Sequence, residues 1–283
     1  MNLQDASASF LTQWISLWMK RWINSVSTIA MQPIIRYPGA KWTLARWIID
    51  HLPEHHGYLE PFFGSGAVFF NKPPAKVETI NDRDGRVVNL FRVLRDHPAE
   101  ICRLLELTPW ARDEYEASYK ETGDPIEDAR RFIVRAWQSF GLKTNHRSGW
   151  AREVALNGRG RHYTSEWNAL PDRVKAIAAR LKFAQTENRP AVELIERFRS
   201  PDVLIYADPP YPKSTVNSWM YKFTMSDDEH AELLEVLDAH PGPVFLSTYP
   251  NEIYENRLGG GPGNRKGPGP SRSAERRRLR CSG

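Results

Sequence analysis

Short strand candidates alternate with helical stretches along most of this chain, and this alternation constrains the fold more than any other feature. Apolar or β-branched runs bounded by turn residues occur at 58–61, 77–81, 183–187, 203–207 and 244–248. Strands joined through helices run parallel, because the connection must return to the same end of the sheet. The sequence therefore predicts an α/β fold with a mainly parallel sheet covered by helices on both faces, and its 283 residues leave room for an insert.

Helical periodicity marks the segments that follow most of these strands. Ser226 and Glu229 stand at the spacing of a capping box, which predicts a helix start. The stretch 141–165 is polar and rich in glycine, so we expect loops there. Helices are expected over 40–51, 67–71, 86–107, 126–140, 171–181, 191–198 and 227–240.

Positive charge is concentrated in two parts of the chain. Residues 257–283 hold eight Lys or Arg and one Glu, so this tail carries about +7 and the remainder about −2 of the net +5. Residues 130–182 hold twelve Lys or Arg against three acidic residues. A local excess of this size fits a polyanionic partner, although a solvated surface accounts for it equally well.

The cysteine count and the chain start bear on the compartment. Cys102 and Cys281 are the two cysteines, and they suggest neither a disulfide framework nor a zinc site. The apolar runs fall short of the roughly 18 residues that a membrane span needs, and residues 1–10 lack the features of a secretory signal. We therefore expect a cytoplasmic protein without a membrane partner.

Residues 1–33 form an N-terminal extension. Aromatic and aliphatic side chains recur in it at helical spacing, so we expect a helix that packs on the body of the protein. An interfacial membrane helix is one alternative. Another alternative is that translation naturally starts at Met31, because the segment with strand and helix patterns begins just after this residue.

A glycine-containing turn, here called the Gly turn (residues 60–66, Glu-Pro-Phe-Phe-Gly-Ser-Gly), follows the first strand candidate. Glycine lets a backbone approach a ligand closely. Asp82 lies eighteen positions beyond Gly64, at the end of the next strand, where an acid typically binds ribose hydroxyls. The turn lacks the Gly-Lys-Ser/Thr ending of a phosphate loop, so a ribose ligand without pyrophosphate, such as S-adenosylmethionine, fits better than a nucleotide. An ordinary tight turn is the alternative.

Lys41 stands at the expected start of the first helix, within Tyr-Pro-Gly-Ala-Lys at 37–41. A lysine at this end of a helix opposes the macrodipole, so its presence needs a reason. One reason is a cation beside the carboxylate of the cofactor, with Tyr37 packed next to it. A solvated lysine is the alternative.

The sequence Asp-Pro-Pro-Tyr at 208–211 follows a buried strand candidate, at the sheet edge where open α/β folds bind ligands. The exocyclic amino group of a base is a poor nucleophile, because its lone pair is delocalised into the ring. Asp208 and the carbonyl of Pro209 can accept hydrogen bonds from its two N–H groups and turn the lone pair toward a methyl donor. The prolines fix where that carbonyl points, and Tyr211 offers a ring on which a base can stack.

The motifs occur in the order found in Dam-like adenine-specific DNA methyltransferases, and residues 34–257 resemble that family, with 246–249 as a further match. The resemblance implies the Rossmann-like class I methyltransferase fold with a seven-stranded sheet, S-adenosylmethionine as cofactor, and a target adenine flipped against Tyr211. The candidate catalytic residues are Asp208, Pro209, Pro210 and Tyr211. The candidate cofactor-binding residues are Tyr37, Lys41, Glu60, Phe62, Gly64, Gly66, Asp82 and Asp208.

The family pattern divides the chain into a catalytic domain at 34–107 and 183–257 and a helical target-recognition insert at 108–182. The insert contains the basic region, and its arginines and amides suit phosphates and base edges. The candidate DNA-binding residues are Lys143, Asn145, Arg147, Arg152, Arg159 and Arg161.

The chain departs from the family at its C-terminal end. The family continues with a helix and strands that complete the sheet, whereas here residues 258–283 form a Gly-, Pro- and Arg-rich tail that we expect to be disordered. A frameshifted or truncated reading frame, with the last strands missing, is the favoured hypothesis. A basic arm that grips phosphates is the alternative.

The sequence leaves other activities open. One is a methyltransferase for RNA or for protein glutamine, although glutamine methylators usually have Asn in place of Asp208 and lack a basic insert. Another is a catalytically impaired DNA-binding relative. The preferred hypothesis is a monomer that methylates N6 of adenine at specific sites in double-stranded DNA, with a cognate restriction endonuclease as its counterpart.

Overall fold

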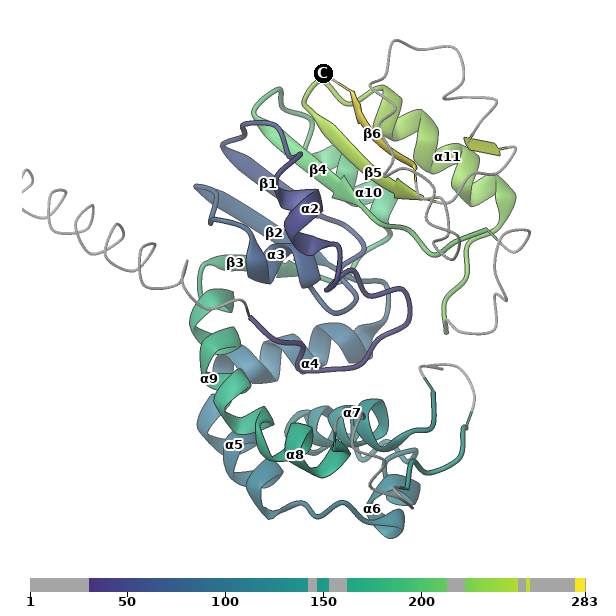
Figure 1. The fold of residues 1–283 in the computed structure, drawn as a ribbon. Coiled ribbons are helices and arrows are strands. Elements are labelled where there is room, and N and C mark those ends of the chain that lie inside the picture. Colours follow the sequence, from purple (N-terminus) through teal and green to yellow (C-terminus); the bar gives the residue numbers. More distant parts are fainter. Residues whose placement is uncertain are drawn as a thin grey trace, which may run out of the picture.

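The fold is built on a six-stranded sheet in the computed structural model, which describes residues 31–141, 147–152, 162–212, 222–248 and 253–254 and the backbone of 278–282. The strand order is β3-β2-β1-β4-β5-β6, and every neighbouring pair runs parallel except the last. The strands are β1 (Gly57–Glu60), β2 (Val77–Asn81), β3 (Ala184–Glu187), β4 (Val203–Ala207), β5 (Val244–Thr248) and β6 (Arg278–Ser282). The five strands expected from the sequence pattern are present, and the mainly parallel α/β fold is confirmed (Figure 1). The described residues form six strands, against the seven that the resemblance implies.

Helices cover both faces of this sheet (Figure 1). Side chains alternate along the strands: Tyr206 packs with one core cluster, and its neighbour Ile205 packs with the other. The first cluster includes residues of α2 (Ala45–Ile49) and α3 (Ala67–Asn71). The second includes residues of α10 (Ala191–Arg197) and α11 (Asp227–Asp238). The arrangement explains why the strands read as continuous apolar runs.

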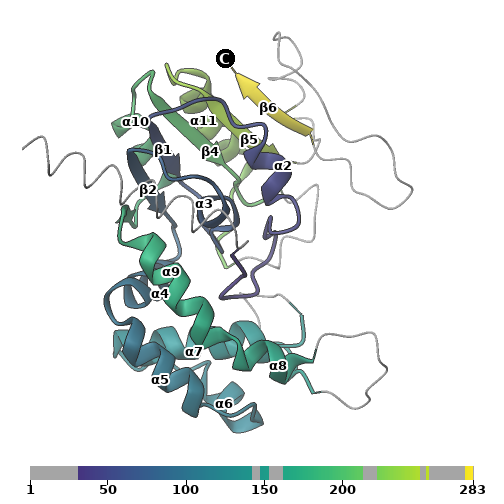
Figure 2. The same cartoon turned by 60° about the vertical axis from the view of Figure 1, so that its left-hand side comes forward.

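A helical subdomain lies beside one end of the sheet, as Figures 1 and 2 both show. α7 packs on α4, and α9 packs on both α5 and α4, so the subdomain shares a continuous core with the sheet. Its helices are α4 (Gly85–Asp96), α5 (Pro98–Leu107), α6 (Arg112–Ala117), α7 (Pro125–Gln138), α8 (Tyr163–Asn168) and α9 (Leu170–Leu181).

The structure corrects several expected helix bounds. The single helix expected over 86–107 is two helices, because Pro98 has no backbone N–H and begins a new helix after His97. The helix expected over 40–51 is limited to α2. Both α6 and α8 lie where no helix was expected, and the first residues of α8 replace the end of the loop expected over 141–165. The capping box of Ser226 and Glu229 is confirmed at the start of α11.

Residues 278–282 also differ from the expected disordered tail. They form β6, which pairs antiparallel with β5. The edge of β5 presents backbone groups that another extended segment can pair with, which gives these residues a place in the sheet. The rest of 258–283 and residues 1–30 lie outside the described residues.

Within the described part of the chain, no helix is both long enough and apolar enough to span a membrane. Nor does this part contain a cluster of His, Cys, Asp and Glu side chains that could hold a metal ion.

Candidate active site

The Gly turn joins β1 to α3 at the carboxyl edge of the sheet. Gly64 and Gly66 have φ angles of 51° and 68°, in the left-handed region that favours glycine. A Cβ atom on Gly66 would lie 2.5 Å from the ring of Phe63. The turn therefore requires glycine at both positions, and it brings its backbone to the open end of the strands.

Asp82 fixes the position of this turn. Its carboxylate accepts hydrogen bonds from the backbone N–H of Gly64 and of Asp84, both at 2.8 Å. Burial raises the pKa of Asp82 to about 6, against the lowering effect of those two hydrogen bonds. Each carboxylate oxygen has a second lone pair, so Asp82 can also accept a ligand hydroxyl.

Lys41 and Asp208 meet across 167 positions of sequence. The Nζ atom of Lys41 lies 2.5 Å from Oδ2 of Asp208 and 2.7 Å from the carbonyl oxygen of Gly39. The Lys41 side chain is 4% exposed, which excludes the solvated lysine. Lys41 precedes α2 by a full turn, so it does not stand at the helix start that the sequence predicts, and the helix macrodipole does not oppose it there. Its direct partner is the Asp208 carboxylate.

Aromatic side chains pack beside the ion pair and beside the Gly turn. The ring of Tyr211 is 7% exposed, and Nζ of Lys41 lies 5.1 Å from its centre, which is a cation–π geometry. Tyr37 packs against the Gly turn: a Cβ on Gly64 would lie 3.2 Å from its ring. Trp42, a residue that the motif pattern did not indicate, donates from Nε1 to Oγ of Ser65 at 3.0 Å and ties the two motifs together.

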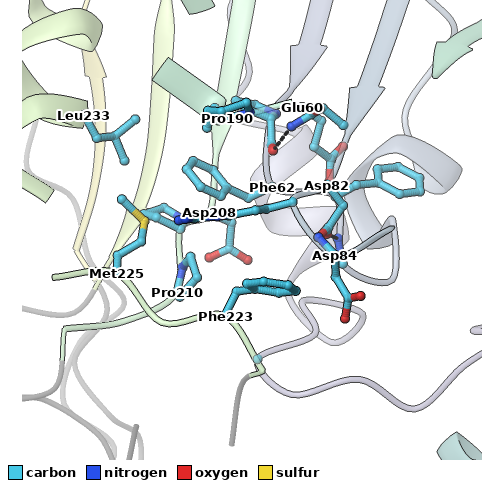
Figure 3. A pocket seen from close by; sticks show the side chains of 18 of the residues that line it. Glu60, Phe62, Asp82, Asp84, Pro190, Asp208, Pro210, Phe223, Met225 and Leu233 are labelled. Atoms are coloured by element: carbon cyan, nitrogen blue, oxygen red, sulfur yellow. Dashed lines mark hydrogen bonds between the residues drawn. The ribbon is translucent and has the colours of Figure 1, made fainter. Parts of the chain in front are cut away.

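These elements enclose a cavity of about 400 Å³, drawn in Figure 3. Two of the described candidate residues, Gly66 and Tyr211, do not line the cavity. Gly66 shapes the turn, and the Tyr211 ring packs under Lys41. The candidate residues that do line it are Tyr37, Lys41, Glu60, Phe62, Gly64, Asp82, Asp208, Pro209 and Pro210.

Other lining residues were not singled out from the sequence. Asp84 follows β2 and Pro190 follows β3, so the rule that ligands bind beyond carboxyl strand ends could have found both. Phe223 and Met225 precede α11 and carry no motif. Their place in the cavity depends on how the chain returns from β4.

Glu60 contributes a buried carboxyl group to the lining of the cavity. Its carboxylate accepts a hydrogen bond from the Tyr58 hydroxyl at 2.6 Å. Burial raises the pKa of Glu60 to about 8, and the nearby Asp208 adds to the increase. With Asp82 and Asp208 on the same cavity, the site suits a ligand that brings positive charge and hydroxyl groups.

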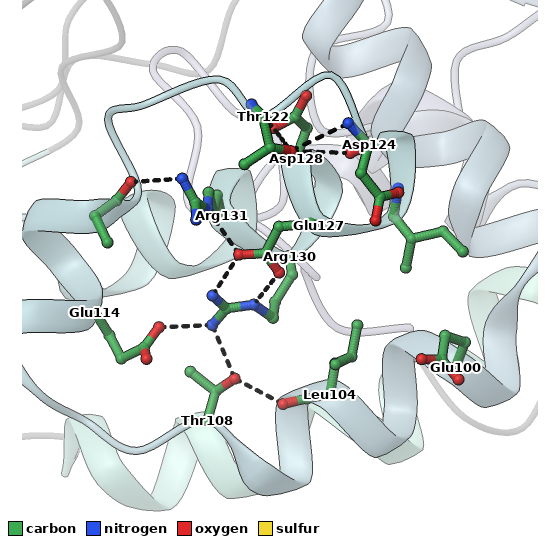
Figure 4. Close-up of polar contacts among 12 residues, drawn as sticks. Glu100, Leu104, Thr108, Glu114, Thr122, Asp124, Glu127, Asp128, Arg130 and Arg131 are labelled. Atoms are coloured by element: carbon green, nitrogen blue, oxygen red, sulfur yellow. Dashed lines mark hydrogen bonds and ion pairs between the residues drawn. The ribbon is translucent and has the colours of Figure 1, made fainter.

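Several arginines of the basic region form ion pairs with neighbouring carboxylates of the subdomain. Arg130 donates to Glu127, to Glu114 at 2.7 Å and to Oγ1 of Thr108 at 3.0 Å (Figure 4). Arg131 donates to Glu127 as well, and the two arginines together lower the pKa of that carboxyl to about 2. These residues therefore do not form a free cationic surface, so the charge count of 130–182 overstates the positive charge that the region can offer to a polyanionic partner.

Two candidate DNA-binding residues fall within the described part of the chain, and both are exposed. The Arg147 side chain is 59% exposed, lies 3.7 Å from Glu116 and sits over the ring of Tyr119. Arg152 follows Ala151 just beyond the bridge between Ser139 and Trp150. Lys143, Asn145, Arg159 and Arg161 lie outside the described residues.

Comparison with known proteins agrees with this geometry. Over 103 residues the chain is 31% identical to the type II methyltransferase M1.LlaDCHI of Lactococcus lactis subsp. cremoris. The aligned region covers 36% of this chain and 35% of that relative, about a third of each. Residues 37–256, which span every motif of the cavity, match the D12 class N6 adenine-specific DNA methyltransferase family. The resemblance drawn from the motif order is thereby confirmed, and the chain belongs to the D12 class of N6 adenine-specific DNA methyltransferases.

Proposed function

We propose that this chain transfers a methyl group from S-adenosylmethionine to the N6 amino group of adenine at specific sites in double-stranded DNA. The observation that carries the proposal is the contact between Lys41 and Asp208 in the wall of the cavity that the Gly turn also lines. A single cavity thus combines residues suited to the methyl donor with residues suited to the amino group that receives the methyl.

The cavity fits S-adenosylmethionine in size and in chemistry. Its volume of about 400 Å³ lies within the usual range for small-molecule sites. Asp82 would accept ribose hydroxyls, Glu60 would face the positive charge of the ligand, and Phe62 and Pro190 offer apolar surface for its adenine ring. When bound, the cofactor supplies a methyl group made electrophilic by a positively charged sulfur.

The residues at 208–211 orient the target amino group. The Asp208 carboxylate and the Pro209 carbonyl accept hydrogen bonds from its two N–H groups, so that its lone pair points into the cavity. Lys41 holds the Asp208 carboxylate in place, and the two prolines restrict the backbone. The contribution of these groups is mainly positioning, which can supply a large part of the rate enhancement of a bimolecular transfer.

We further propose that Tyr211 stacks against an adenine flipped out of the duplex. In this structure its ring lies under Lys41 and is almost fully buried, so entry of the base has to uncover it. DNA would be held by the exposed Arg147 and Arg152 together with Lys143, Asn145, Arg159 and Arg161.

The cellular setting belongs to the same proposal. The relative from Lactococcus lactis is named a type II methyltransferase, which supports a role in restriction and modification with a cognate endonuclease as counterpart. We propose that the protein acts in the cytoplasm as a monomer. Light scattering of the purified protein with and without DNA tests the oligomeric state.

Transfer of tritiated methyl groups tests the substrate class. The wild-type chain is incubated with labelled S-adenosylmethionine and unmethylated DNA, RNA or cell protein. We expect label in DNA, recovered as N6-methyladenine, and we expect its loss in Asp208→Ala. Asp202→Ala is a matched control, since Asp202 is an exposed aspartate that immediately precedes β4, at the opposite end of the strand from Asp208. Label confined to RNA or to protein would overturn the proposal.

A further inference from the structure

An ion pair joins two walls of the cavity at its outer rim. Nη1 of Arg83, in the turn after β2, lies 2.9 Å from Oε1 of Glu229, in the first turn of α11. Both residues line the cavity. Arg83 follows β2, and Glu229 lies in α11, which follows β4 along the chain. Since β1 lies between β2 and β4 in the sheet, the ion pair crosses the cavity above the carboxyl end of β1.

Glu229 is held by a second contact that does not involve Arg83. Its Oε2 atom accepts the backbone N–H of Ser226 at 2.8 Å, as part of the capping box of α11. The two oxygens of one carboxylate thus serve separate partners. Arg83 can be removed while the helix cap stays intact, which makes the ion pair testable by itself.

Phe223 lies beside this ion pair. Its ring is 36% exposed, lines the cavity and appears in Figure 3 near Asp84, Asp208 and Pro210. The guanidinium of Arg83 lies 5.8 Å from the ring centre. A large apolar ring is therefore presented to the cavity, close to the arginine that bridges the rim.

We propose that Phe223 is a further binding residue, which covers S-adenosylmethionine in the cavity, and that the Arg83–Glu229 pair is a positioning contact that holds it there. The inference rests on the proposed function. The side chains of Arg83 and Glu229 are 56% and 39% exposed, so the pair is weak and is screened by salt. A weak contact suits a cover that has to open each time product leaves.

The rate at which labelled S-adenosylhomocysteine leaves the protein tests this inference. The label is chased with excess unlabelled compound at low and at high salt. We expect Arg83→Ala to speed release by up to about five-fold at low salt, the limit set by an exposed ion pair. High salt should speed release from the wild-type chain and have less effect on the variant. Arg83→Lys, which keeps the charge, should stay close to wild type.

Phe223 is tested in the same assay. Phe223→Ala should speed release by about ten-fold, the scale of one aromatic stacking interaction, and Phe223→Tyr should restore it. The controls are Arg95→Ala, in an exposed ion pair outside the cavity, and Phe183→Ala, an exposed ring that does not line it. Neither should change the rate.

The outcomes separate this inference from the proposed function. Unchanged release from Arg83→Ala and Phe223→Ala, with normal methyl transfer by the wild-type chain, would overturn the cover and leave the activity standing. A wild-type chain that retains no S-adenosylhomocysteine would overturn both.

Discussion

The carboxyl groups of Glu60 and Asp82 have pKa values well above their ordinary range. Burial raises the pKa of Glu60 to about 8 and that of Asp82 to about 6. Near neutral pH, Glu60 is therefore mostly protonated in the free protein. A bound cation favours the ionised form of Glu60, and ligand hydroxyls favour the ionised form of Asp82. Binding of the cofactor should then release protons.

We expect the affinity for S-adenosylmethionine to increase as the pH rises from about 5.5 to 8.5. Affinity rises with pH because the carboxyls attract the ligand only when they are ionised. Burial raises both pKa values, which places the two ionisations within this pH range. Glu60→Gln should flatten the upper part of this increase, since an amide does not titrate. Calorimetric titration at a series of pH values measures both effects. Glu187→Gln, outside the cavity lining, should behave like wild type. An affinity that falls with pH in the wild-type chain would contradict this account.

At the scale of elements, a buried charge cluster joins α9 to the sheet. Arg180 on α9 donates to both carboxylate oxygens of Glu78 on β2, and Lys72, which follows α3, donates to Glu78 at 2.6 Å. Each of the three side chains is 1% exposed. Removing Arg180 would take two hydrogen bonds from the buried Glu78 carboxylate and leave the space of a large buried side chain empty. This cluster therefore connects α9 of the helical subdomain to β2, the strand that precedes Asp82.

Arg180→Ala should lower the free energy of unfolding by about 3–5 kcal/mol. The matched control is Arg197→Ala, which breaks an exposed ion pair with Glu193 and should cost less than about 1 kcal/mol. Urea denaturation followed by circular dichroism measures both. Equal losses in the two variants would show that the buried cluster does not stabilise the protein.

The elements also show what sequence reasoning can and cannot supply. The sequence predicts the strands well because each is a buried apolar run that ends at turn residues, as in 203–207 before Asp208. Apolar periodicity does not predict the break at His97, because the pattern continues across it. In the site, the contiguous motifs were recognisable, whereas Arg83 and Phe223 have no local pattern. Only the sheet order brings these two residues to one cavity.

At the scale of the whole molecule, net charge does not locate the DNA-binding surface. The tail accounts for the positive balance of the chain, and in the helical subdomain Arg130, Arg131 and Arg180 have carboxylate partners. The exposed Arg147 and Arg152 are better candidates within the described part of the chain. Binding should depend on such exposed arginines rather than on the total charge.

The double variant Arg147→Ala/Arg152→Ala should bind DNA more weakly and with a smaller dependence on salt. Each phosphate that is no longer neutralised by an arginine reduces the slope of log K against log salt by about 0.9. Fluorescence anisotropy with a labelled duplex at several salt concentrations measures affinity and slope together. Arg95→Ala removes one partly exposed arginine outside the basic region and should change neither. An unchanged slope in the double variant would remove both arginines from the interface.

In the proposed mechanism, methyl transfer depends most on the orientation of the target amino group by Asp208. The most direct measurement is the yield of N6-methyladenine in unmethylated DNA, determined by mass spectrometry of its nucleosides under single-turnover conditions. We expect the wild-type chain to form this product. Asp208→Asn should form it at least about a hundred-fold more slowly, the scale of a misplaced reactant, while still binding S-adenosylhomocysteine and DNA. Methylation at the wild-type rate by Asp208→Asn, or a methylated nucleoside other than N6-methyladenine, would contradict this mechanism.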